Sequence, residues 1–137
     1  MRHASVVASV LAFALWAQAV PQNGPKRQIP CKTAENAATC FWTHGRLQEY
    51  EETPAYRLWK IGTRHLFGIY NGPSAWRGNR LAIDNEGPEL PSNLRKLVQS
   101  GLVQVFGDFE VCPLEPERPG SMQAACIESA KNLFLQK

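Results

Sequence analysis

Residues 102–113 read Leu-Val-Gln-Val-Phe-Gly-Asp-Phe-Glu-Val-Cys-Pro and carry the clearest alternation in the chain. The odd positions from 103 to 111 hold valine, glycine or phenylalanine, whereas positions 104, 108 and 110 hold Gln, Asp and Glu. An apolar–polar alternation with a period of two is typical of a strand with one buried face. This stretch therefore predicts a long β-strand, which we take as the fourth strand of the domain.

Three shorter strands precede it. Residues 41–50, 55–61 and 65–70 are rich in aromatic and β-branched side chains. The acidic, proline-containing segment 51–54 separates the first pair, and Gly62-Thr63-Arg64 predicts a tight turn between the second pair. Asn71-Gly72-Pro73 ends the third strand. A loop with Gly78 and Asn79 then leads to the short apolar piece 81–83.

A short helix is predicted just before the alternating strand. Ser92 is a suitable N-cap, and Leu94, Leu97 and Val98 fall on one helical face. Gly101 is suited to the C′ position that ends such a helix. After turn residues 116–121, residues 123–135 predict a fifth strand, although residues 122–137 are also compatible with a helix.

The order strand, strand, strand, helix, strand, strand is that of the OB-fold, a five-stranded Greek-key barrel. We therefore predict a mainly β OB-like barrel over residues 41–137, with the helix between the third and fourth strands. Residues 20–40 are predicted to form a flexible leader, with three prolines before residue 31, and a small cysteine loop.

Residues 1–19 have the pattern of a signal peptide. A basic start with Arg2 and His3 precedes an apolar run over 6–16, and Ala17-Gln18-Ala19 supplies the small residues of a cleavage site. The run is too short to span a membrane. Cleavage would leave 118 of the 137 residues, with 14 basic side chains (15 less Arg2) and 12 acidic ones. We expect a secreted or periplasmic protein.

Four cysteines remain after that site, at positions 31, 40, 112 and 126. An even number of cysteines in an oxidising compartment predicts two disulfides. A last hairpin centred on Pro119 would place Cys112 opposite Cys126 on its polar face. This favours Cys112–Cys126 and Cys31–Cys40 bridges, with the two crossed connectivities left open. The paired C-x2-C spacing of a zinc site does not occur.

The distribution of charge suggests a binding face. No Asp or Glu occurs from Thr53 to Ile83, where basic and aromatic side chains alternate irregularly. The predicted ligand-binding residues are Arg57, Trp59, Lys60, Arg64, Trp76, Arg77 and Arg80. Strands two and three form the ligand face of an OB-fold, and basic groups beside aromatic rings suit anionic or planar oligomers. An ordinary solvated sheet over an aromatic core is the competing interpretation.

No catalytic motif, Walker sequence or Rossmann glycine pattern occurs in the chain, so we predict no catalytic residue, no metal and no cofactor. His44 and His65 are the two histidines beyond the signal peptide. A catalytic dyad would require one of them to pair with Asp84, Asp108 or Glu128, whereas a hydrogen-bonded strand histidine is the simpler interpretation. Gly45, next to His44, is interpreted as marking a bulge.

Four strings, at residues 44–47, 57–63, 106–114 and 126–130, resemble those of small secreted bacterial proteins that are uncharacterised. The first reads His-Gly-Arg-Leu and the third reads Phe-Gly-Asp-Phe-Glu-Val-Cys-Pro-Leu. The resemblance implies a bacterial periplasmic or secreted setting and no particular activity.

Together these features predict a non-catalytic binding module whose partner is an anionic polymer or another protein. One alternative is a small secreted hydrolase that uses a histidine and a carboxylate held together in a concave pocket. Another is an accessory protein that binds its partner through an exposed edge strand.

Overall fold

The computed structural model describes residues 27–76, 87–98 and 104–136. Within them are β1 (Phe41–Glu49), β2 (Tyr56–Lys60), β3 (Leu66–Ile69), α1 (Ser92–Val98), β4 (Gln104–Pro113) and β5 (Gln123–Gln136). A short 3-10 helix, η1 (Ala37–Thr39), precedes β1. The predicted signal peptide, the piece 81–83 and Gly101 lie outside these ranges.

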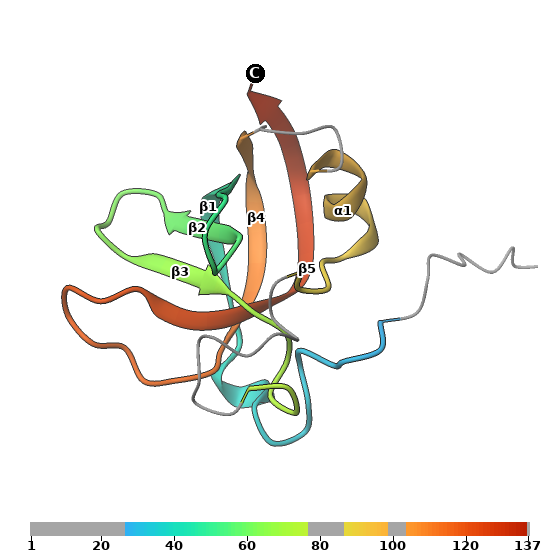
Figure 1. The fold of residues 1–137 in the computed structure, drawn as a ribbon, viewed down its shortest axis with the longest axis vertical. Helices are drawn as coiled ribbons and strands as arrows, with labels where there is room; N and C mark the ends of the chain where they lie inside the picture. Colours follow the sequence, from blue (N-terminus) through green and yellow to red (C-terminus); the bar gives the residue numbers. More distant parts are fainter. Residues whose placement is uncertain (1–26, 77–86, 99–103, 137) are drawn as a thin grey trace, which may run out of the picture.

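The five strands close into a barrel in the order β1-β2-β3-β5-β4. Neighbouring strands are antiparallel except β3 and β5, which run parallel. Figure 1 shows the strands wrapped around a common interior, with α1 beside the upper half of β5. The prediction of an OB-like barrel with one helix between the third and fourth strands is confirmed, and residues 123–136 form a strand rather than a helix.

The barrel interior is filled by the alternating side chains of each strand. Leu47, Leu58, Phe67 and Phe109 are fully buried and come from four different strands. The predicted inward positions of β4 that the structure describes, from Val105 to Val111, are buried. Burial of such side chains provides the main driving force for folding.

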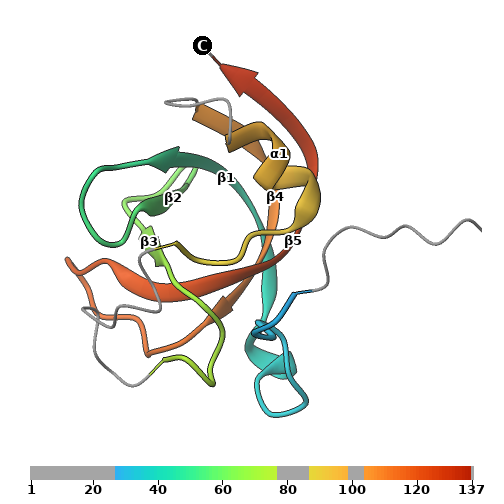
Figure 2. The ribbon, with the colours of Figure 1, turned by 45° about the vertical axis from the view of Figure 1, so that its right-hand side comes forward.

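The helix closes one end of the barrel. Leu94 and Val98 project into the hydrophobic core, and Leu97 packs against its margin. Figure 2 shows α1 lying across the end of the barrel between β1 and β5. The first helical hydrogen bond runs from the Arg95 N–H to the Pro91 carbonyl, so Ser92 occupies the first helical position rather than the predicted N-cap.

The bulges lie in β4 and β5, not at Gly45. Gly45 pairs regularly with Lys60 and with Gly107. Glycine suits this position because a Cβ there would lie 2.7 Å from Leu58 Cδ1, which would have to move. The β4–β5 register shifts between Phe106 and Asp108, around Gly107, so the predicted bulge at Gly45 is wrong.

Cys112 and Cys126 face each other across the β4–β5 ladder, as the hairpin centre predicts. They are not bonded to each other: the disulfides are Cys31–Cys126 and Cys40–Cys112. The predicted neighbour pairing is therefore wrong. The face was expected to be polar and open, but segment 27–40 covers it, and Cys31, Cys112 and Cys126 form a small buried cluster there.

Polar contacts tie the same segment to the barrel. The Arg27 guanidinium donates to the carbonyls of Ile127 and Glu89, at 2.8 and 2.7 Å. The Glu89 carboxylate accepts from the backbone N–H groups of Gln28 and Ile29. Burial lowers the pKa of Arg27 from its usual value. Residues 27–30, which the sequence assigns to a flexible leader, are thus fixed to the domain.

Close packing of main chain on main chain completes this attachment. A Cβ on Gly72 would lie 1.7 Å from the Pro30 carbonyl oxygen, so only glycine lets the two backbones approach this closely. Lys32 extends from the same segment to Glu110, with Nζ 2.6 Å from Oε1. The hydrogen bond to Glu110 raises the pKa of Lys32. Among the helices described, none is long and apolar enough to cross a membrane.

Candidate functional site

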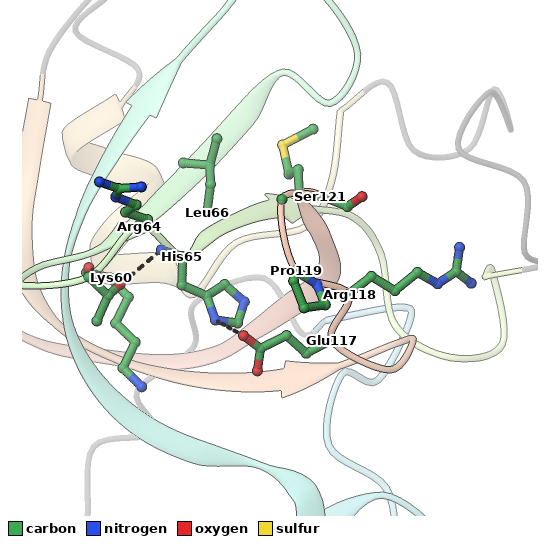
Figure 3. Close-up of a pocket in the computed structure, with 11 residues that line it drawn as sticks. Lys60, Arg64, His65, Leu66, Glu117, Arg118, Pro119 and Ser121 are labelled. Carbon is green, nitrogen blue, oxygen red and sulfur yellow. Dashed lines mark hydrogen bonds and ion pairs between the residues drawn. The ribbon is translucent and has the colours of Figure 1, made fainter.

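A pocket of about 580 Å³ opens between the β2–β3 turn and the β4–β5 loop. Residues 60–66 form one wall and residues 117–122 form the other. Figure 3 shows His65 at its centre, with Glu117 and Pro119 facing it from the loop. The volume suits a small ligand or one unit of a longer chain.

Local hydrogen bonds shape the first wall. Gly62 has a φ of 82°, which lets the chain reverse direction directly after β2. The Thr63 N–H and hydroxyl both donate to the Lys60 carbonyl, at 3.2 and 2.7 Å. The Thr63 hydroxyl in turn accepts from the His65 N–H at 2.9 Å. The predicted turn at 62–64 is confirmed, and it presents Arg64 and His65 at the pocket.

The second wall is held by Glu115 and Gln123. The Gln123 side-chain N–H donates to the Glu115 carbonyl at 2.8 Å, and the Glu115 carboxylate accepts from the Ala124 N–H at 2.9 Å. At the tip, Gly120 has a φ of 76°, and the Ser121 N–H donates to the Arg118 carbonyl at 3.1 Å. These contacts form a defined loop that projects Glu117 and Arg118 over the pocket.

His65 joins the two walls. Its Nε2 lies 2.8 Å from Gln123 Oε1, and its Nδ1 lies 3.2 Å from Glu117 Oε1. The ring stacks on Phe67 at a centroid distance of 4.2 Å, and the side chain is only 15% exposed. Glu117, at the other end of the ion pair, is 66% exposed.

Cations outnumber carboxylates around the pocket. Within the described part of the chain, Lys60, Arg64 and Arg118 line it, and Glu117, the one acidic lining residue there, already contacts His65. In Figure 3 the three cationic side chains extend to different sides of His65 rather than converging on one point. Lys60 Nζ also lies 5.6 Å from the centre of the Phe41 ring. The pocket therefore carries more positive than negative side chains, and their hydrogen-bond donors lie on several sides of it.

The predicted ligand-binding residues do not all share one face. Arg57 and Trp59 point to the outside of the barrel, whereas Lys60 has the inward parity of Leu58 and extends over the barrel end. Trp76 packs on Tyr70, with ring centroids 5.0 Å apart. Arg77 and Arg80 lie outside the described residues. Of the five that the structure describes, Lys60 and Arg64 line the pocket.

On the outer face, aromatic rings and arginines pair with each other. The Arg57 guanidinium lies 4.3 Å from the centre of the Tyr50 ring, and Arg46 lies 5.1 Å from that of Trp59. The Nε atoms of Arg46 and Arg57 are buried without a hydrogen-bond partner. The cations of this face are thus engaged in cation–π contacts within the protein.

The outer surface of β3, the usual ligand side of an OB-fold, is covered by the protein itself. A Cβ on Gly68 would lie 2.8 Å from Pro54 and within 3.3 Å of Tyr70 and Met122. The loops on either side of this face therefore meet across it. The sheet surface at Gly68 is therefore occupied by these neighbouring side chains.

A second histidine–carboxylate pair lies across β1 and β4. His44 Nδ1 is 3.0 Å from Asp108 Oδ1, and the Asn132 side chain donates to Asp108 Oδ2 at 2.8 Å. The hydrogen bonds from Asn132 and His44 lower the pKa of Asp108. On the outside of the barrel, His44 is exposed and Asp108 is half-buried, with 54% and 32% of their side-chain surfaces accessible.

The hydrolase alternative requires a histidine within hydrogen-bond reach of a carboxylate in a pocket, and His65 with Glu117 has this geometry. Glu117 was not among the carboxylates that the sequence suggested. His44 also has a carboxylate partner, but the pair lies on the outer strand face rather than in the pocket. Within the described ranges, no group of three His, Cys, Asp or Glu side chains is placed to hold a metal ion.

Sequence reasoning identified Lys60 and Arg64 from the absence of acids between residues 53 and 83. It missed Arg118 and Glu117 because they belong to the Glu-Pro-Glu-Arg stretch at 115–118, which was interpreted only as a turn. The mixed charge of that stretch was the available signal. His65 was noticed, but its partner Glu117 was not among the carboxylates considered.

Comparison with known proteins gives no further assignment. No family model matches the chain, and neither a curated protein nor a solved structure matches it significantly.

Proposed function

We propose that this protein is a non-catalytic binding module of an oxidising, extracytoplasmic compartment, and that it binds an anionic ligand in the pocket between the β2–β3 turn and the β4–β5 loop. The observation that supports the proposal is the charge of this cavity. Lys60, Arg64 and Arg118 line it, and Glu117, the one acidic residue among the described lining residues, is already paired with His65. A cavity lined by one sign of charge concentrates ligands of the opposite sign.

The two disulfides support the choice of compartment, because such bonds persist where thiols are not kept reduced. The hydroxyl-bearing and apolar lining residues support an organic anion rather than a bare ion. Thr63, Ser121 and Leu66 provide hydrogen-bonding and apolar contacts beside the cations.

Charge reversal tests the proposal. Polygalacturonate, a polymer of carboxylate sugars, would be titrated into the wild-type protein at low salt and then at increasing salt. Binding should weaken steeply as salt is added, since screening reduces interactions between exposed charges. The double variant Lys60→Glu/Arg64→Glu should lose most of this binding while keeping its thermal midpoint, because exposed charges contribute little to stability.

The matched control is Lys96→Glu/Lys131→Glu, which makes the same change in net charge at exposed residues of α1 and β5. This control should bind nearly as tightly as wild type. Equal losses in both double variants would mean that net charge, not the pocket, governs binding. No salt-sensitive binding by wild type would refute the proposal and bring the protein–protein alternative forward.

The hydrolase alternative is favoured by one observation, the His65–Glu117 pair in the pocket. Its test is hydrolysis of an activated ester by wild type and by His65→Ala, with His44→Ala as the control. Turnover that is lost in His65→Ala and kept in His44→Ala would establish it.

The edge-strand alternative requires a strand with an unpaired edge, and the closed barrel restricts where such an edge can lie. β3 pairs with β5 only as far as Ala125. Among the described strands, the later residues of β5 therefore pair with β4 alone, and they are the place where a partner strand could add.

A further inference from the structure

The hydrogen bonds around His65 determine where its protons lie. The Gln123 amide nitrogen donates to the Glu115 carbonyl, and therefore its oxygen is the atom that faces His65 Nε2. An amide turned the other way would place two oxygens against each other. Because Gln123 Oε1 only accepts, His65 Nε2 must carry a hydrogen.

The other ring nitrogen faces a second acceptor. Nδ1 lies 3.2 Å from the Glu117 carboxylate, where a hydrogen on Nδ1 would form a hydrogen bond to the ionised carboxylate. The geometry therefore accommodates a ring with a hydrogen on each nitrogen, between the Gln123 oxygen on one side and a carboxylate on the other. Phe67 stacks on the ring and limits its contact with water, so the anion is a substantial part of its polar environment.

The two partners of the ring differ in how firmly they are held. Gln123 is buried and is fixed by its own bond to Glu115. Glu117 is two-thirds exposed, lies on the pocket wall, and has its one ion pair among the described residues with His65. The carboxylate end of this pair faces water, so another anion can compete for the position beside Nδ1.

We propose that Glu117 occupies the position at which the carboxylate of the ligand binds, so that the protein's own loop is a competitor for its pocket. The ligand is then a carboxylate-bearing organic molecule whose anionic group accepts the hydrogen bond from His65 Nδ1. Arg64 and Arg118 lie on either side of this position, and Leu66 supplies an apolar wall for the carbon frame. This inference rests on the proposed function and adds to it the ligand class and the residue that recognises it.

The test uses acetate as the probe and the histidine ring nitrogens as reporters. Nitrogen NMR spectra of the wild type and of Glu117→Gln would be recorded at one mildly acidic pH, where imidazole carries both hydrogens. Sodium acetate would replace sodium chloride at constant ionic strength. The His65 signals should move at about two- to fivefold lower acetate concentration in Glu117→Gln, as expected when an exposed ion pair no longer competes.

His44 is the internal control, because it lies outside the pocket and keeps its bond to Asp108. Glu51→Gln is the matched control for loss of one negative charge, since Glu51 is exposed and does not line the pocket. Repeating the titration with sulfate and phosphate separates carboxylates from other anions; a stronger response to either would overturn the carboxylate assignment.

The same acetate response in Glu117→Gln and wild type, or the same gain in Glu51→Gln, would also overturn the inference. That failure is distinguishable from failure of the proposed function. If Lys60→Glu/Arg64→Glu still abolishes polygalacturonate binding, the pocket binds anions and only the role of Glu117 is refuted.

Discussion

The N-terminal segment 27–40 and the wall of the pocket at 117–122 are attached to the same barrel by different kinds of bond. The segment has two disulfides, a half-buried arginine and close backbone packing against Gly72. The pocket wall depends on the Gln123 amide and on an ion pair to His65. The segment therefore has the stronger attachments, and the loop at 117–122 can exchange its contacts at little cost in stability.

The largest effect should come from the disulfides of the segment. Cys31→Ser/Cys126→Ser opens a bridge between residues 95 apart in sequence and should lower the free energy of unfolding by about 4 kcal/mol. The loop closed by Cys40–Cys112 spans 72 residues, so Cys40→Ser/Cys112→Ser should cost nearly the same. Denaturant unfolding measures both. A loss below about 1 kcal/mol would contradict the assignment of stability to this region.

Gly72 tests the packing of the segment without changing its covalent bonds. A Cβ there meets the Pro30 carbonyl, so Gly72→Ala should destabilise by about 2 kcal/mol through overpacking. Gly87 is the matched control, because a Cβ there would meet no atom within 4 Å. Equal thermal midpoints for Gly72→Ala and Gly87→Ala would show that the segment tolerates displacement.

A substitution of His65 tests the attachment of the pocket wall at 117–122. His65→Ala removes the ring stack on Phe67 and both polar contacts, and should cost about 1 kcal/mol. The effect should be local: hydrogen exchange at the Ser121 amide should accelerate, while the Ile29 amide, bound to Glu89, should keep its protection. His44→Ala is the control. Equal acceleration at Ser121 and Ile29 would mean that the two regions open together.

The smallest effect is expected on the outer face, which has neither a disulfide nor the pocket. The native pKa of Asp108 is lowered, first by the bond from Asn132 and then by that from His44. Its contribution is therefore present above the pKa of an unfolded aspartate, about 3.9, and is lost as pH falls through the native pKa. The stability difference between wild type and Asp108→Asn should shrink as the solution is acidified. A stability difference that grows on acidification would contradict the lowered pKa of Asp108.

The sequence is informative wherever one face of a strand is buried. The alternation over the described residues 105–111 correctly predicts the inward face of β4, and the turn around Pro119 correctly predicts that Cys112 opposes Cys126. The predicted bridges are wrong for a physical reason. Strand parity tells which side of the sheet a cysteine takes, but it does not tell that the N-terminal segment, whose cysteines lie 95 and 72 residues before their partners, covers that side.

The candidate site was predictable only in part. The absence of acidic residues between positions 53 and 83 points to Lys60 and Arg64. The alternation along β2 puts Lys60 and Arg57 on opposite sides of the sheet, so the sequence already indicates that the predicted binding residues do not share one face. Glu117 enters the pocket because a loop folds back over a turn more than 50 positions earlier in the sequence. Such a contact depends on barrel closure, and no local pattern in the sequence specifies it.

The two nested bridges, Cys40–Cys112 inside Cys31–Cys126, also constrain how the molecule can be made. A chain is synthesised from its N-terminus, so Cys31 and Cys40 emerge well before Cys112 and Cys126. Until then the first two thiols have only each other as partners, and the loop they would close is absent from the finished protein. Oxidation must therefore follow completion of the last hairpin, or an early bond must be exchanged by thiol–disulfide reshuffling. Production in a host with a disulfide isomerase should accordingly favour the native form.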